Sequence, residues 1–81
     1  MILHVYPTQA QAVQAYKGFP EKLLSREHKL ETLTRAGERV AFRCVNSLSR
    51  LQEFKGLHIQ AVHDHGISVE YLRLLQSFIR E

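Results

Sequence analysis

The 81 residues are enough for one domain with a small hydrophobic core, so we treat residues 1–81 as a single unit. A hydrophobic content of 44% with 23% charged residues excludes a disordered chain, and the single cysteine, Cys44, excludes an internal disulfide. The formal charge of +3 is compatible with nucleic acid or with an acidic protein as partner. Apolar stretches are too short for a membrane span and no signal peptide opens the sequence, so we expect a cytoplasmic protein.

The first quarter of the sequence predicts a strand followed by two helices. The apolar residues 2–6 form the strand, and Thr8 with Gln11 three positions later has the spacing of a capping box for a helix at about 9–17. Gly18 is expected to end that helix in a left-handed conformation. Proline at position 20 is typical of the first turn of a helix, here at about 20–27.

Two β-rich segments, 29–35 and 38–45, predict a hairpin with Gly37 at its turn. In the second segment, apolar residues alternate with Arg39 and Arg43, as in a strand that is buried on one side. A second helix that continues from Leu23 to Leu33 is the competing interpretation, because its leucines also share a helical face.

The last part of the sequence predicts a helix at 47–55, a short buried strand at 57–62 and a final helix at 68–80. Ser68 is the expected N-cap of the final helix. Strands that alternate with helices favour an α/β fold, with a small mixed sheet of about four strands whose first and last members are parallel.

Taken in order, these segments resemble the ATPase core of phage terminase large subunits and related helicase-like motors. Residues 5–11, with Pro7-Thr8 at their centre, resemble the strand and the Gln-bearing helix that follow the phosphate loop in that family. Residues 36–37, 40–43 and 51–57 resemble its hairpin turn, its aromatic-containing strand and the segment before its metal-binding strand. The resemblance implies a phage-encoded protein, located in the host cytoplasm.

The sequence departs from that family at the residues that handle nucleotide. The phosphate loop G-x-x-x-x-G-K-[ST] does not occur among the 81 residues. The family's metal-binding strand ends in Asp-Glu, and only Asp64 matches, because His65 takes the place of the glutamate. Without a phosphate-loop lysine, little stabilises the charge that phosphoryl transfer develops. The resemblance therefore implies a non-hydrolytic scaffold.

Histidines at the end of the predicted fourth strand form a candidate metal site. His63 and His65 are two residues apart, so on a strand their imidazoles share one face and can hold one Zn²⁺ ion. A third ligand has to come from His4, Asp64 or His28. The alternative is that these polar residues are simply the solvated exit of a buried strand.

Arginines on the predicted hairpin form a candidate nucleic-acid surface. Arg39 and Arg43 share a face of the second strand and Arg35 lies near the turn, a spacing that suits successive phosphates. Glu31 and Glu38 lie nearby in the sequence and reduce the net positive charge of this surface. The alternative is an edge or outer strand whose charged side chains only keep it soluble.

The final helix carries more apolar residues than one stripe facing a sheet requires. We expect Val69, Leu72 and Ile79, together with Leu75, to face the sheet. The surplus, Tyr71, Leu74 and Phe78, then provides a candidate surface for a protein partner or for a homo-oligomer.

Four functions remain open, in the following order. The first is a small non-enzymatic interaction module, phage-encoded, which binds a protein partner and needs no cofactor. The second is a nucleic-acid-binding accessory protein that uses the arginines of the hairpin. The third is a metal-dependent hydrolase that uses His63, Asp64 and His65, and the last is a fragment of a larger motor.

Overall fold

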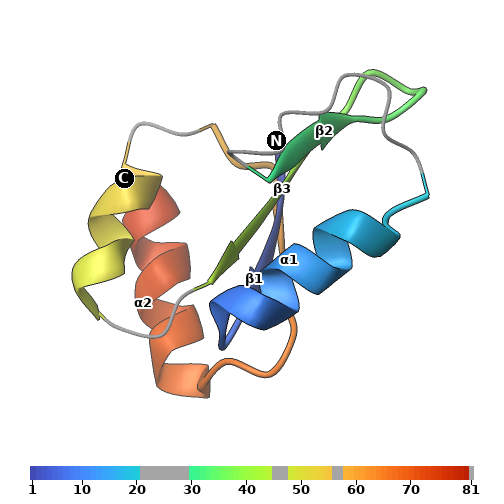
Figure 1. Cartoon of the computed structure of the whole chain (residues 1–81). Helices are drawn as coiled ribbons and strands as arrows, with labels where there is room; N and C mark the ends of the chain where they lie inside the picture. The colour runs from blue at the N-terminus through green and yellow to red at the C-terminus, as the bar shows by residue number, and fades with distance from the viewer. Residues whose placement is uncertain (21–29, 45–47, 56–57, 81) are drawn as a thin grey trace.

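The computed structural model describes residues 1–20, 30–44, 48–55 and 58–80 and shows a four-stranded mixed sheet with helices on both faces (Figure 1). This arrangement confirms the predicted α/β class. The elements in chain order are β1 (Ile2–Tyr6), α1 (Gln9–Gly18), β2 (Glu31–Leu33), β3 (Arg39–Cys44), the 3₁₀ helix η2 (Leu48–Phe54), β4 (Ala61–Asp64) and α2 (Val69–Arg80).

The strands lie in the order β2-β3-β1-β4, so β1 is central. It pairs in parallel with β3 on one side and with β4 on the other, as predicted for the first and last strands. Strands β2 and β3 form the predicted antiparallel hairpin. Gly37 has a φ of +80° at its turn and donates its N–H to the carbonyl of Thr34, which confirms the role expected of that glycine.

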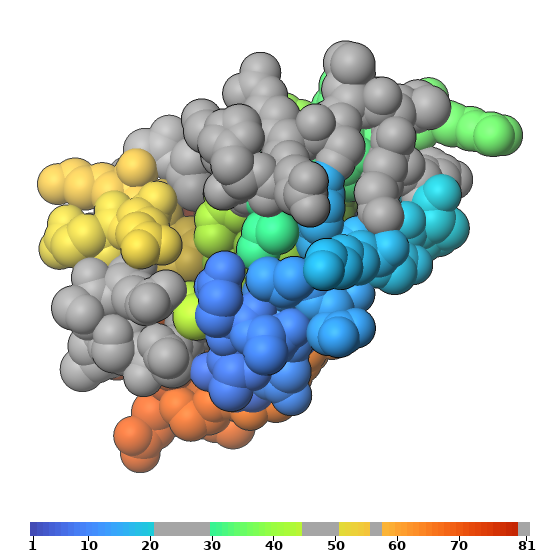
Figure 2. All heavy atoms as spheres, viewed as in Figure 1, coloured from blue at the N-terminus to red at the C-terminus, as the bar shows by residue number. Residues whose placement is uncertain are grey.

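The face of the sheet covered by α2 and η2 carries an apolar core. Side chains alternate along a strand, so Leu3 and Val5 of β1 point to this face, where both are fully buried. They pack with Phe54 of η2 and with Tyr71 and Leu75 of α2. Figure 2, in the same view as Figure 1, looks onto the other side of the sheet, with the blue and cyan atoms of α1 in front and the orange atoms of α2 behind them.

The face covered by α1 carries a second cluster, which lies mainly over β3. Ala12 and Tyr16 of α1 pack against Val40, Phe42 and Cys44. Cys44 is 3% exposed, as expected for a buried thiol. Because α1 packs chiefly on β3, the α1 face of β1 and β4 is less well covered.

Side-chain caps fix the start of each helix. The N–H of Gln11 donates to Oγ1 of Thr8 at 3.3 Å, and the N–H of Tyr71 donates to Oγ of Ser68 at 3.1 Å. Both caps were predicted, and each satisfies a backbone donor that a helix start leaves without an intrahelical partner. Gly18, in contrast, lies inside α1, and its φ is not positive, so the left-handed helix end expected there is wrong. The helix closes instead with the N–H of Phe19 bonded to the carbonyl of Tyr16.

The predicted buried strand at 57–62 is wrong in position and in burial. Strand β4 is Ala61–Asp64, and only Val62 among its side chains is half-buried. The apolar residues of segment 57–62 favour a buried strand, which the mostly exposed side chains of β4 contradict. Among the described residues, strand β4 pairs on one side only, with β1, and an edge strand needs fewer apolar side chains.

Other boundaries shift by smaller amounts. The segment predicted as a helix at 47–55 forms a 3₁₀ helix, Leu48–Phe54. The predicted hairpin strands 29–35 and 38–45 shorten to Glu31–Leu33 and Arg39–Cys44. The predicted helix at 20–27 lies almost entirely outside the described residues, as do His28 and position 47.

Candidate functional site

Aromatic and imidazole rings gather on the α1 face of the sheet, where α1 does not reach. On β1 the residues that alternate with Leu3 and Val5 are His4 and Tyr6. The parallel register aligns His63 of β4 with His4, and His65 follows directly after β4. We call His4, Tyr6, His63 and His65 the ring surface.

The rings of this surface form two rows across the strands. In the first row, the His4 ring centroid lies 5.2 Å from that of Phe42 and 4.8 Å from that of His63. In the second row, the rings of Tyr6 and His65 stack with centroids 4.3 Å apart and an angle of 5° between their planes. These cross-strand contacts hold the rings side by side, so the surface is ordered before any ligand binds.

A hydrogen bond joins the two rows. Nδ1 of His4 and Nε2 of His65 are 2.9 Å apart, and one of them carries the shared proton. The backbone N–H of His65 also donates to the carbonyl of Val5 at 3.0 Å, which extends the β4 pairing by one residue. Burial, reinforced by the neighbouring His63 and His65, lowers the pKa of His4 to about 4. His4 is therefore neutral at pH 7.

Asp64 sets the direction in which the chain leaves this surface. Its Oδ1 accepts the backbone N–H groups of Gly66 and Ile67 at 2.9 and 2.8 Å. Gly66 takes a φ of +102° at this turn, a conformation that suits glycine. The carboxylate matched by the terminase resemblance thus caps the turn that holds His65 next to β1.

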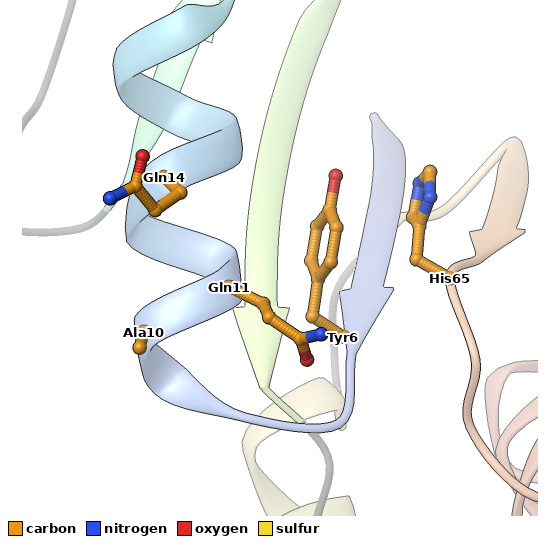
Figure 3. Close-up of a pocket in the computed structure, with 5 residues that line it drawn as sticks. All are labelled: Tyr6, Ala10, Gln11, Gln14 and His65. Carbon is orange, nitrogen blue, oxygen red and sulfur yellow. The ribbon is translucent and has the colours of Figure 1, made fainter.

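A pocket of about 420 Å³ lies between the ring surface and α1, and Figure 3 shows the side chains that line it. The lining residues are Tyr6, Ala10, Gln11, Gln14 and His65. Burial raises the pKa of Tyr6, so its hydroxyl stays protonated at neutral pH and can donate a hydrogen bond. None of the five residues carries a formal charge. The pocket lies at the carboxyl ends of the parallel strands β1 and β4, where open α/β sheets place their ligands.

His63 and His65, predicted to hold a metal, both lie on the ring surface. His65 uses Nε2 for its hydrogen bond to His4. Within the described part of the chain, no group of three or more His, Cys, Asp or Glu side chains is arranged to hold a metal ion. The zinc site stays a prediction.

Two of the three arginines predicted to bind nucleic acid form ion pairs with the same carboxylate. The Oε1 and Oε2 atoms of Glu31 accept from Arg39 at 2.9 Å and from Arg43 at 2.6 Å. Burial alone would raise the pKa of Glu31, but the bonds from both arginines outweigh it and lower that pKa below its ordinary value. Arg35 is exposed near the hairpin turn. The shared carboxylate offsets part of the positive charge that phosphates would meet.

The three residues predicted as a protein interface on α2 differ in exposure. Tyr71 is buried and Phe78 is half-buried against the same core, whereas Leu74 is 49% exposed. Val69 was expected to face the sheet and is 64% exposed, so that expectation is wrong. The buried stripe of α2 begins at Tyr71 and continues through Leu75, which leaves the first residue of the helix outside it.

Tyr6, Gln11 and Gln14 line the pocket but were not predicted as site residues. Their signal is present but indirect. His4 and Tyr6 alternate with two apolar residues on β1, and His63 and His65 have the same two-residue spacing. Once β1 and β4 are expected to be parallel neighbours, that spacing places four rings together, although the register between the strands is needed to align them.

Comparison with known proteins adds no relative: no protein-family model, curated protein or solved structure matches the chain. The resemblance to terminase motors therefore stays a prediction. Neither α1 nor α2, the two α-helices of the described residues, is long and apolar enough to cross a membrane.

Proposed function

We propose that the protein is a small non-enzymatic interaction module, and that a protein partner binds on the ring surface and the adjoining pocket. The observation that carries the proposal is the α1 face of β1 and β4, which α1 covers less well than it covers β3. There the chain holds four polar rings in fixed contact beside a pocket of about 420 Å³. Most of the remaining sheet surface is covered by apolar packing.

The composition of this surface suits a protein. Tyrosine offers a large, rigid contact area with a polar end, and aromatic residues are common at the centres of protein interfaces. The exposed amides of Gln11 and Gln14 can donate and accept hydrogen bonds, which matches the peptide groups of a bound chain.

Two groups that could serve catalysis, the Asp64 carboxylate and the Cys44 thiol, have structural contacts. The Asp64 carboxylate accepts two backbone N–H groups at the turn after β4. The thiol of Cys44 lies in the core beneath α1. These contacts support a binding role, and the sequence supports it further because it lacks the phosphate loop of the motors it resembles.

The experiment is affinity capture from the protein's own cell background, followed by measurement of binding to the purified captured protein. We expect Tyr6→Ala to weaken that binding about tenfold or more, because truncation of a central aromatic residue typically costs ~2 kcal/mol. Leu74→Ala, on the opposite side of the sheet, is the matched control and should leave the Kd unchanged.

Two outcomes would overturn the proposal. If Leu74→Ala weakens binding and Tyr6→Ala does not, the partner binds α2. If capture is lost after nuclease treatment, the partner is nucleic acid, and the arginines of the hairpin become the candidate contact.

A further inference from the structure

We infer that the pocket between Tyr6 and α1 receives a single aromatic side chain of the partner, resting on the function proposed above. One wall is the tyrosine ring, whose other face is already stacked on His65. The opposite wall is the first part of α1, with the small Ala10 beside Gln11 and Gln14 (Figure 3). A flat group that enters between these walls stacks on a ring that cannot easily turn away.

The pocket is large enough to take one such side chain. Its volume of about 420 Å³ lies at the lower end of the range for ligand pockets, roughly 300–1,000 Å³. Its walls consist of a ring, a methyl group and the side chains of two glutamines and a histidine. An aromatic ring gains stacking and burial here, whereas an aliphatic side chain gains burial alone.

The distribution of charge favours a neutral ring over a nucleotide base. In the part of the chain that the structure describes, no charged residue lines the pocket. Arg39 and Arg43 alternate with Val40 and Phe42 on β3, so they point to the opposite face of the sheet, where both bond Glu31. A base bound in the pocket would bring its phosphate to a surface whose lining offers no cation.

The pocket is also pre-organised, which reduces the entropy lost on binding. His65, which backs the tyrosine ring, is held by its bond to His4 and by its backbone bond to β1. On the other wall, Oε1 of Gln11 accepts the hydroxyl of Thr8 at 3.1 Å. That bond leaves the NH₂ group of the Gln11 side chain as the donor for a partner's backbone carbonyl.

The test is a nuclear magnetic resonance titration of the isotope-labelled full chain with small probes. N-acetyltryptophanamide and N-acetyltyrosinamide should shift the signals of Tyr6, His65 and the side-chain amide of Gln11 in a saturable way. N-acetylleucinamide should leave them in place. Equal shifts with the leucine probe, or shifts with adenosine monophosphate alone, would overturn the inference.

A pocket-filling variant makes the test independent of the probes. Ala10 is exposed on α1, so Ala10→Trp should fold and occupy the pocket with its own ring. Gln9→Trp adds the same side chain at the neighbouring exposed position, outside the pocket lining, and is the matched control. We expect Ala10→Trp to abolish the probe shifts and to weaken partner binding about tenfold or more, with Gln9→Trp unchanged.

Different results would contradict this inference and the proposed function. If Ala10→Trp leaves the partner's Kd unchanged while Tyr6→Ala weakens it, the ring surface binds the partner and the pocket is not used. If both variants bind as the wild type does, the proposed function itself is wrong.

Discussion

On the α2 side of the sheet, Leu3, Val5 and Ala41 are fully buried, whereas on the α1 side His63 and His65 remain exposed. The same central strand builds both sides, because its side chains alternate between them. One side buries apolar area, the main source of stability. On the other side, polar rings occupy positions of β1 and β4, and these rings contribute less to stability. Positions where a chain departs from the rules of core packing are where function is expected.

The largest expected effect separates the two sides by their contribution to stability. Leu75 is fully buried in the α2-side core, so Leu75→Ala should lower the free energy of unfolding by about 2–5 kcal/mol. His65→Ala removes two exposed ring contacts, with Tyr6 and His4, and one hydrogen bond, and should cost about 1 kcal/mol. Urea denaturation followed by circular dichroism measures both.

Equal losses in the free energy of unfolding would show that the ring surface packs as strongly as the core. The two sides of the sheet would then not differ in their contribution to stability. If Leu75→Ala does not fold, Leu72→Ala provides a milder version. Leu72 is only half-buried against the same core, and its truncation should fall between the two values.

The next effect concerns the one buried carboxylate among the described residues. Glu31→Ala removes the acceptor for Arg39 and Arg43 and should lower the free energy of unfolding by about 1–3 kcal/mol. The exposed Glu38→Ala on the same hairpin is the control and should stay within about 0.5 kcal/mol of the wild type.

The pH dependence of this carboxylate has a definite sign. The pKa of Glu31 is lowered in the folded protein, so its stabilising contribution is present above its ordinary value of 4.5 and is lost as the pH falls through the folded pKa. The difference in the free energy of unfolding between the wild type and Glu31→Ala, measured by urea denaturation, should therefore shrink at strongly acidic pH. A difference that stays constant would contradict this ion-pair contribution.

A smaller effect tests the ring surface at mildly acidic pH. The pKa of His4 falls from 6.5 to about 4 on folding, so between these values the unfolded chain binds a proton that the folded chain does not. Stability should decline as the pH falls from 6.5 towards 4. The titratable groups that face His4 are His63 and His65.

His4→Phe keeps a ring in the stack but cannot be protonated. Its free energy of unfolding should decline less steeply than that of the wild type between pH 7 and pH 5, measured by urea titration. The exposed His58→Gln serves as the control and should follow the wild-type curve. Parallel curves for His4→Phe and the wild type would show that His4 takes up its proton equally in both states.

The smallest expected effect is on the outer surface of α2. Leu74 is 49% exposed, so Leu74→Glu should change the free energy of unfolding by less than about 0.5 kcal/mol. If the chain forms a homo-oligomer through α2, the same variant should convert it to a monomer in light scattering. An oligomer that survives the change would exclude α2 as its contact.

Local signals in the sequence predicted the elements that depend on local chemistry. Thr8 and Ser68 cap α1 and α2 where expected, and Gly37 turns the hairpin. The alternation of Val40 and Phe42 with arginines predicted β3 and its two faces. These features depend on residues a few positions apart, so the sequence shows them directly.

The parallel direction of β1 and β4 was predicted, but finer features that depend on distant pairing were not. Strand β4 was placed too early because its edge position makes apolar content a poor guide. The contact of Tyr6 with His65 requires the β1–β4 register, which no local pattern specifies. From the sequence, Glu31 was expected only to reduce the positive charge near the arginines. Its bond from Arg43 was missed, because it joins residues twelve positions apart across the hairpin.

The central position of β1 also governs the order in which the molecule can assemble. Its Ile2 aligns with Val40 and with Ala61, so both of its pairings join segments that are distant in the sequence. Such non-local pairing slows folding, because the intervening chain must first be closed into a loop. The hairpin of β2 and β3 can form early, but the stack of Tyr6 on His65 exists only after β4 docks. The pocket beside Tyr6 is therefore complete only after β1 and β4 have paired.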